Sequence, residues 1–218
     1  MNIELDFISI EVECGALVEA PLLEQFNQAL NKVEDAACNT CLLIKLTGNV
    51  PKHSAQAQLT STDMTSRWEK VVRRVERCQA LTLFIAEGPV GGVMMNLLLA
   101  CDYKVAQPDL TFNVFNGPMP ICDMTIFRLA HSLTTKDVNN LVLFGNAVGS
   151  QQALELGLLD AVVTDTQDYV RAFMAKLNPS VLSDIHIRRR LIKDPRSESY
   201  EDSLGVFLAA SDRAFRRN

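Results

Sequence analysis

The sequence lacks any apolar run long enough to cross a bilayer, and it carries little excess positive charge. Its longest apolar stretch, residues 90–101, is well short of the about 20 residues that a membrane helix needs. The first residues contain neither a basic region nor an apolar signal core. The net charge of −5 and the pI near 5.3 argue against a broad nucleic-acid-binding surface. The sequence therefore predicts a cytoplasmic protein that binds neither membranes nor nucleic acids.

Spacings typical of metal or redox sites are also lacking. The histidines His53, His131 and His186 show no ligand spacing relative to one another. Cys38 and Cys41 form a C-x-x-C pair, but no second pair follows, whereas a structural zinc site needs four ligands. Cys41 opens an apolar strand rather than a helix, which disfavours a redox pair. We expect no metal, and we expect most of the six cysteines to pack as small apolar groups.

The 218 residues suffice for one domain with a sizeable core, and no change in composition marks a second domain. Strands are expected at residues 3–12, 41–46, 81–86, 103–106 and 110–114. Helices are expected at residues 21–33, 68–78, 93–100, 124–133, 137–144, 150–156, 166–177, 181–192 and 200–216, and a polar loop at 49–65. This alternation predicts an α/β fold with parallel strands. The basic clusters at 73–74 and 188–190 are interpreted as solvated helix faces.

A glycine-rich turn between a buried strand and an apolar helix is the most informative segment. The turn is Gly88-Pro89-Val90-Gly91-Gly92. The N–H groups at a helix start are unpaired and favour negative charge, and glycines let another group approach the backbone. The segment therefore suits an anion, or a carbonyl oxygen that becomes one. A strand–helix connection that merely packs closely explains it equally well, and the absence of a following Gly-Lys-Ser/Thr excludes a P-loop.

Several segments, in their order and spacing, resemble the crotonase (enoyl-CoA hydratase/isomerase) superfamily. They are residues 43–48, 81–102, 102–112 and 143–163, and together they extend over positions 5–165. The resemblance implies a ClpP-like spiral fold of ββα units with C-terminal helices. Residues 1–165 would form the crotonase-like core, and residues 166–218 a C-terminal helical region of the same domain that could support trimerisation.

A closer resemblance is to the DpgB-type crotonases of 3,5-dihydroxyphenylglycine biosynthesis, through residues 68–77, 97–110, 187–191 and 199–217. In that pathway a type III polyketide synthase condenses malonyl-CoA, and crotonase-like partners promote loss of water on the way to 3,5-dihydroxyphenylacetyl-CoA. The resemblance implies an acyl-CoA substrate and no cofactor beyond the CoA of that substrate. It implies a type III synthase and a crotonase-like protein as partners, in a homo-oligomer (trimer or hexamer) or a hetero-oligomer.

The resemblance also assigns an oxyanion hole, in which two backbone N–H groups hold a thioester carbonyl and stabilise its enolate. The second donor corresponds to Val93 or to its neighbour Gly92. The first corresponds to Ala57, in a loop where Gln56 and Gln58 replace the glycine and the acid of the family.

Both glutamates that move protons in hydratases are missing. Asn96 occupies the first position, and an amide cannot serve as a general base near neutral pH. The second position falls near Asn116, in a stretch without a carboxylate. Asp123 is the nearest substitute, although it could instead cap the next helix. His53 could be an acid–base group or a substrate contact, or it could be a structural or solvent-facing loop residue. Asp102 is expected to satisfy backbone groups or a partner arginine.

The sequence thus favours a hydratase-like protein that promotes dehydration and aromatisation of a polyketide-derived acyl-CoA. A catalytically inactive scaffold or activating subunit is the first alternative, favoured by the missing glutamates and opposed by the retained glycine turn. A decarboxylase or isomerase is the second, because either reaction could proceed from enolate stabilisation alone.

Overall fold

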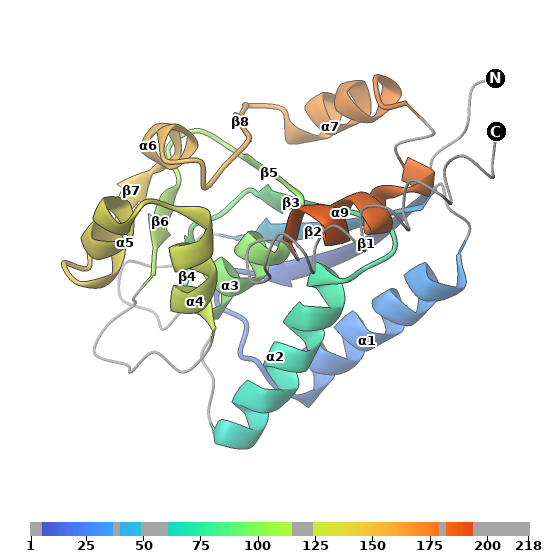
Figure 1. Cartoon of the computed structure of the whole chain (residues 1–218), viewed down its shortest axis with the longest axis horizontal. Coiled ribbons are helices and arrows are strands. Elements are labelled where there is room, and N and C mark those ends of the chain that lie inside the picture. The colour runs from blue at the N-terminus through green and yellow to red at the C-terminus, as the bar shows by residue number, and fades with distance from the viewer. Residues whose placement is uncertain (1–5, 37–39, 49–60, 115–123, 179–181, 194–218) are drawn as a thin grey trace, which may run out of the picture.

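The computed structural model describes residues 6–36, 40–48, 61–114, 124–178 and 182–193 (Figure 1). Its strands are β1 (Asp6–Glu13), β2 (Thr40–Thr47), β3 (Leu81–Ala86), β4 (Val90–Gly91), β5 (Tyr103–Ala106), β6 (Thr111–Asn113), β7 (Val148–Gly149) and β8 (Ala161–Val162). Its helices are α1 (Ala20–Asp35), α2 (Thr62–Glu76), α3 (Val93–Ala100), α4 (Thr125–Ser132), α5 (Thr135–Val142), α6 (Ser150–Glu155), α7 (Thr166–Ala175) and α9 (Ile185–Lys193).

The strands form one parallel sheet and one small mixed sheet. The larger sheet has the order β1-β2-β3-β5-β8, and all of its pairs are parallel. In the smaller sheet β4 pairs parallel with β6, and β6 pairs antiparallel with β7. Every residue of the central strand β3 is buried, as expected for a parallel sheet that is covered on both faces. The expected α/β fold with parallel strands is confirmed.

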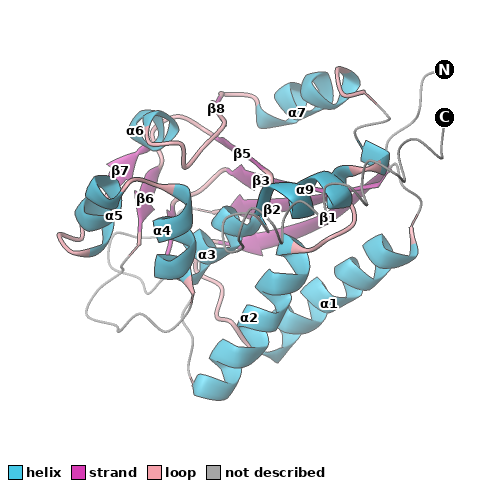
Figure 2. Ribbon diagram, viewed as in Figure 1, coloured by secondary structure: helices cyan, strands magenta, loops and turns pink. Residues whose placement is uncertain are grey.

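Helices cover both faces of the larger sheet (Figure 2). Alternate strand residues point to opposite faces. Ile44 and Phe84 therefore belong to the main core with α1, α2 and α3, while Leu83 and Ile85 pack on the other face with residues of α7. The glycine turn after β3 lies at the carboxyl end of this sheet, where it leads into α3.

Helix α2 begins earlier than the sequence pattern predicts. The expected loop to residue 65 is wrong for its last residues, because Ser61 caps a helix that starts at Thr62. The Ser61 hydroxyl accepts the Met64 N–H at 3.1 Å, which satisfies one of the amides left free at the helix start. The expected apolar stripe of α2 is confirmed, and its Trp68 is fully buried with its ring edge-on to Phe26.

Other differences concern short elements and helix caps. The strands β7 and β8 were not expected, because two residues are too few to give a periodic signal. Helix α4 begins at Thr125, one residue later than expected, with Met124 at its N-cap and no hydrogen bond from the Met124 side chain. The helix expected at 200–216 and Asp123 itself lie outside the described residues.

The described cysteines pack as expected. Cys14, Cys41, Cys78 and Cys101 are free and buried, while Cys38 and Cys122 lie outside the described residues. Burial raises the pKa of the Cys14 thiol to about 11 and the pKa of the Cys41 thiol to about 12. Within the described ranges, no group of His, Cys, Asp and Glu side chains could hold a metal ion, and no helix is long and apolar enough to cross a membrane.

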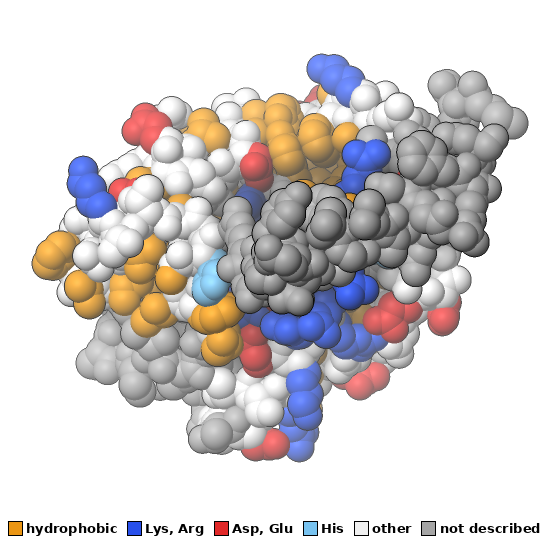
Figure 3. All heavy atoms as spheres, viewed as in Figure 1, with side chains coloured by type: hydrophobic (Ala, Val, Ile, Leu, Met, Phe, Trp, Pro, Cys, Tyr) orange, Lys and Arg blue, Asp and Glu red, His pale blue; other side chains and the backbone are white. Residues whose placement is uncertain are grey.

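Exposed apolar side chains gather over α4 and α5 on the face shown in Figure 3. Four of them, Met124, Phe127, Leu143 and Phe144, are between 41% and 71% exposed. Phe127 lies against the ring of His131, with the ring centroids 4.2 Å apart.

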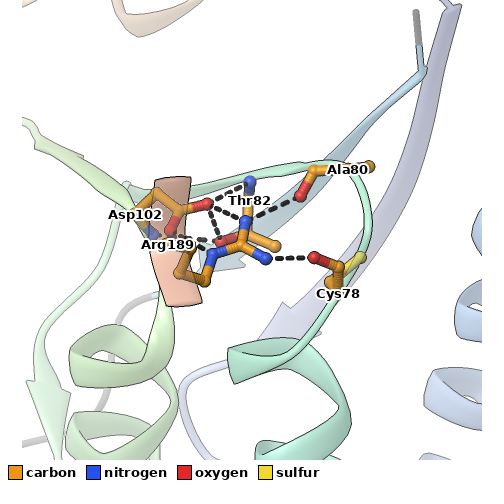
Figure 4. A network of polar contacts seen from close by, with 5 residues as sticks. All are labelled: Cys78, Ala80, Thr82, Asp102 and Arg189. Atoms are coloured by element: carbon orange, nitrogen blue, oxygen red, sulfur yellow. Dashed lines mark hydrogen bonds and ion pairs between the residues drawn. The ribbon is translucent and has the colours of Figure 1, made fainter. Parts of the chain in front are cut away.

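A buried arginine ties α9 to the start of β3 (Figure 4). Arg189 Nε donates to Asp102 Oδ1 at 2.7 Å, and Nη2 donates to the Ala80 carbonyl at 2.8 Å. Further hydrogen bonds join Arg189 to Asp102 Oδ2 and to the Cys78 carbonyl. Asp102 Oδ2 also accepts the Thr82 amide at 2.9 Å. The expected arginine partner of Asp102 is therefore confirmed, and the solvated-face interpretation of residues 188–190 is wrong for Arg189, which is 6% exposed.

Replacing this arginine should destabilise the protein strongly. Arg189→Ala leaves Asp102 and two backbone carbonyls without their donor, and breaking such a buried pair costs about 3–5 kcal/mol. Urea unfolding followed by circular dichroism measures the loss. The matched control is Arg188→Ala on the exposed side of α9, which should stay within about 0.5 kcal/mol of the wild type. Equal unfolding free energies for the two variants would contradict the expectation.

Candidate active site

The turn between β3 and α3 holds three strand ends close together. A Cβ atom at Gly88 would lie 2.4 Å from both the Cys14 sulfur and the Gly48 carbonyl oxygen. The Cys14 thiol itself donates to the Gly48 carbonyl at 3.4 Å. Only glycine fits at position 88, because the Gly48 carbonyl is backbone and cannot move aside cheaply. The first glycine of the turn thus serves packing, and the polypeptide leaves β3 against the ends of β1 and β2.

Gly92 then sets the start of α3. Its φ of 54° and ψ of −131° lie in a region that only glycine adopts readily. Its N–H donates to the Asn113 carbonyl at 3.3 Å, and its carbonyl accepts the Met95 N–H at 3.1 Å. The amides of Val93 and Met94 find no acceptor among the described residues, as is usual in the first turn of a helix. These two N–H groups, with the positive end of the helix dipole, can receive a carbonyl oxygen that gains negative charge.

Asn96, one turn into α3, joins three helices. It is fully buried. Its Nδ2 donates to Glu69 Oε2 of α2 at 3.0 Å, and its Oδ1 accepts from Arg128 Nη1 of α4 at 2.6 Å. Arg128 also pairs with Glu69 Oε1 at 2.7 Å and with Glu76 Oε2 at 3.3 Å. The amide at the position of the first family glutamate is therefore bound at both ends, within a cluster of Glu69, Glu76, Asn96 and Arg128 that we call the α2–α4 cluster.

The charge of Arg128 is secured by its two carboxylate partners. Burial alone would lower the pKa of this guanidinium, but the hydrogen bond to Glu69 and the charges of Glu76 and Glu69 more than reverse that effect and raise it. The Arg128 side chain is only 6% exposed, and its Nε finds no partner within the described ranges. The α2–α4 cluster thus contains one fixed positive charge and two acids.

A second ion pair stands directly before the glycine turn. Lys45 Nζ lies 2.8 Å from Glu87 Oε2, and the Thr166 hydroxyl donates to Glu87 Oε1 at 2.5 Å. Burial would raise the pKa of Glu87, but the hydrogen bonds from Lys45 and Thr166 lower it overall. Both carboxylate oxygens of Glu87 therefore have a partner, and the residue joins β2, the glycine turn and the start of α7.

The structure brings together three of the residues that the sequence singles out. Gly92, Val93 and Asn96 lie on the first turns of α3. The other candidates, Ala57, Asn116, Asp123 and His53, lie outside the described residues, so their roles stay predictions. Sequence reasoning did not single out Glu69, Glu76 and Arg128. A signal was present, because Glu69 and Glu76 are seven residues apart and so share one face of α2.

Sequence comparison with known proteins identifies the superfamily to which the chain belongs. No family model matches the chain. An enoyl-CoA hydratase of Amycolatopsis orientalis is 32% identical over 196 residues, which cover 89% of this chain and 89% of the relative. The chain belongs to the enoyl-CoA hydratase (crotonase) superfamily.

Solved crotonase structures match the fold. The enoyl-CoA hydratase of Thermoplasma volcanium superposes with a TM-score of 0.78 at 15% identity, over 95% of this chain and 89% of that one. The enoyl-CoA hydratase of Bacillus anthracis gives a TM-score of 0.73 at 18% identity, over 97% and 90% of the two chains. The crotonase fold expected from the sequence is confirmed.

Removing the Asn96 amide should destabilise this crotonase. Asn96→Ala takes a hydrogen-bond partner from Glu69 and from Arg128, and a buried group left unsatisfied costs about 1–3 kcal/mol. The unfolding free energy in urea measures the loss. Asn140→Ala, on the exposed side of α5, is the matched control and should change stability by less than about 0.5 kcal/mol. A loss equal to that of the control would contradict the bridging role.

A side chain at Gly92 should strain the start of α3. Gly92→Ala forces a φ of 54° and a ψ of −131° on a residue with a Cβ, which costs about 1–3 kcal/mol. Thermal unfolding would report this as a lowered Tm. Gly149→Ala serves as the control, because its φ of −78° suits any residue and nothing lies within 4 Å of the added Cβ. A Tm for Gly92→Ala as high as that of the control would mean that the turn relaxes freely.

Proposed function

We propose that this crotonase binds a polyketide-derived acyl-CoA thioester and promotes loss of water from it, next to a type III polyketide synthase, in the formation of 3,5-dihydroxyphenylacetyl-CoA. The observation that carries the proposal is the start of α3, where Gly92 turns the backbone so that the Val93 amide is left unpaired among the described residues. Membership of the crotonase superfamily and the Amycolatopsis orientalis relative named as an enoyl-CoA hydratase support the acyl-CoA substrate.

The chemistry follows from the charge that develops on the thioester. Removal of a proton from the carbon next to the carbonyl places negative charge on the carbonyl oxygen, and the hydroxyl group on the next carbon can then depart as water. An N–H donor aimed at that oxygen contributes about 2.7–4 kcal/mol in a comparable site. The elimination exchanges no electrons with an outside carrier, so the proposed reaction needs no cofactor beyond the CoA of the substrate.

The synthase partner and the aromatic product rest on the resemblance of residues 68–77, 97–110, 187–191 and 199–217 to DpgB-type crotonases. A linear polyketide thioester becomes aromatic by ring closure and loss of water, and a site that stabilises enolates suits those steps. A trimer, a hexamer or a hetero-oligomer with a second crotonase is part of the same proposal.

A second candidate is an activating subunit without catalysis of its own. The observation that favours it is Asn96, which stands where hydratases of this family carry a glutamate and which is bound at both ends by Glu69 and Arg128. Such a subunit would raise the product yield of the synthase through contact alone, and it would not depend on the Val93 amide.

Replacing Val93 by proline tests the leading function. Val93 is the first residue of α3, a position where proline fits the helix and removes only the N–H. We expect the rate of aromatic product formation from malonyl-CoA, with a type III synthase present, to fall about 10²–10³-fold. Val93→Ala keeps the amide and so separates the loss of the donor from the loss of the valine side chain.

Circular dichroism of each variant verifies that the fold persists. If Val93→Pro supports the synthase as well as the wild type does, the oxyanion role fails and the activating subunit is favoured. If the yield never depends on this protein at all, both candidates fail.

A further inference from the structure

Glu69 is a carboxylate held beside the first turn of α3. In an α-helix each side chain leans toward the N-terminus, so the Asn96 side chain lies over the turn that begins at Val93. The Asn96 amide donates to Glu69 Oε2 at 3.0 Å. The carboxylate of α2 is thereby placed next to the helix start that, on the proposed function, receives the thioester carbonyl.

Among the residues of the α2–α4 cluster, the acids are the parts that solvent can reach. The Asn96 side chain is fully buried and that of Arg128 is 6% exposed, whereas those of Glu69 and Glu76 are 24% and 20% exposed. Glu69 is bonded to both Asn96 and Arg128, which fix its two oxygens separately. A side chain fixed in this way and still accessible has the two properties that a proton-transferring group needs.

From these contacts we propose that Glu69 is the catalytic acid–base residue of this chain and that Asn96 and Arg128 are positioning residues for its carboxylate. The proposal rests on the proposed dehydration and goes beyond it, because it assigns the proton transfer to α2. The missing glutamate on α3 would then be replaced by an acid from the neighbouring helix.

The charges of the α2–α4 cluster allow Glu69 to exist with and without its proton. When Glu69 is ionised, Arg128 at 2.7 Å and the Asn96 amide stabilise the carboxylate. When Glu69 is protonated, Arg128 still has the carboxylate of Glu76 at 3.3 Å, so no buried charge is left without a partner. A guanidinium with one acid would lose its only counter-ion on protonation, and the second acid removes that penalty.

Two other partly buried acids, Asp102 and Glu87, have a different arrangement. Asp102 is paired with Arg189 and also accepts from the backbone and hydroxyl of Thr82. Glu87 is paired with Lys45 and bonded to Thr166. In each case one cation is paired with one acid, and no second acid is paired with that cation among the described residues. Neutralising the acid would therefore leave the cation without a counter-ion.

The proposed step balances without an outside reagent. The Glu69 carboxylate takes a proton from the carbon next to the thioester carbonyl, and the electron pair of that C–H bond forms an enolate whose oxygen accepts the Val93 N–H. The enolate then forms the carbon–carbon double bond as the C–O bond to the hydroxyl breaks. Glu69 returns its proton to the departing hydroxyl, which leaves as water, and the carboxylate is restored.

The main test is the full-length protein carrying Glu69→Gln, assayed with the type III synthase and malonyl-CoA. Glutamine keeps the size of the side chain and one acceptor oxygen but cannot take up the proton. We expect kcat to fall about 10²–10⁴-fold with little change in KM. Asp63→Asn, an exposed acid of the same helix paired only with Arg67, is the matched control and should leave kcat unchanged.

The pH profile separates catalysis from a merely structural role. The wild-type pH–rate profile should contain an acid limb that is lost in Glu69→Gln, because that variant lacks the proposed proton-transferring group. Around Glu69, α4 contributes the cation Arg128, α2 contributes Glu76, which shares that cation, and α3 contributes the uncharged Asn96. The exposed Arg73 lies one turn further along α2. If Glu69→Gln does not fold, Glu76→Gln remains informative. Removal of that negative charge should move the acid limb of the pH–rate profile if the limb belongs to a group of the α2–α4 cluster.

Three results would overturn the assignment while leaving the proposed function intact, provided that Val93→Pro is impaired. They are a Glu69→Gln protein with kcat within about threefold of the wild type, an acid limb that survives in that variant, and an acid limb that Glu76→Gln does not move. Loss of the limb in Asp123→Asn but not in Glu69→Gln would likewise assign the proton transfer to Asp123. If Val93→Pro is as active as the wild type, the proposed function itself fails.

Discussion

One buried amide connects the three helices around the candidate active site. Asn96 has both ends of its side chain occupied, by a carboxylate of α2 and by a guanidinium of α4. Because every residue of α3 except Leu99 is buried, this short helix has almost no freedom to shift without breaking those bonds. The position of its first turn, and hence of the unpaired Val93 amide, depends on that connection.

Two buried arginines, Arg128 and Arg189, join different elements of the domain and differ in the number of acids they pair with. Arg189 attaches α9 to the loop before β3 with a single acid and two backbone carbonyls, and its Nε, Nη1 and Nη2 atoms each have an acceptor. Arg128 instead has two acids and an amide, and its Nε finds no partner in the described part of the chain. The first arrangement is charge-balanced and rigid, as a structural anchor should be. The second contains one acid more than Arg128 needs as a counter-ion, and the proposed proton transfer by Glu69 rests on that feature.

The sequence predicts most of the fold because its strands are strongly patterned. The ranges 81–86 and 103–106 agree with β3 and β5 to the residue. The first is a fully buried run, and the second is a short strand whose last two residues are buried. The pattern fails where an element is too short to repeat, as in β7 and β8. It also fails where a single side-chain hydrogen bond sets the first residue of a helix. The Ser61 hydroxyl caps α2 several residues before the apolar stripe of that helix begins.

The candidate site was only partly predictable, and the reason is physical. Backbone donors leave a local signal in glycines, so Gly92 and Val93 could be found from the sequence alone. A side-chain network joins residues of different helices that are 27 to 59 positions apart, and no local sequence pattern at Glu69 or at Arg128 predicts the other residue as its partner. The arginine partner of Asp102 could be anticipated as a type of residue, but its identity as Arg189 needed the fold.

The difference between backbone groups and side chains explains how a site can keep its backbone oxyanion donor while the residue that transfers the proton changes. The proposed oxyanion donor is a backbone N–H, so any side chain that fits at position 93 can accompany it, whereas the conformation of Gly92 must be kept. A proton-moving acid depends on where a carboxylate lies and much less on which helix supplies it. With an amide at position 96, a carboxylate from α2 can occupy the adjoining space, because the amide donates to the carboxylate, whereas two acids in contact would repel. An amide rather than a glutamate at position 96 and a carboxylate at position 69 are thus linked, because two carboxylates at this distance would repel each other.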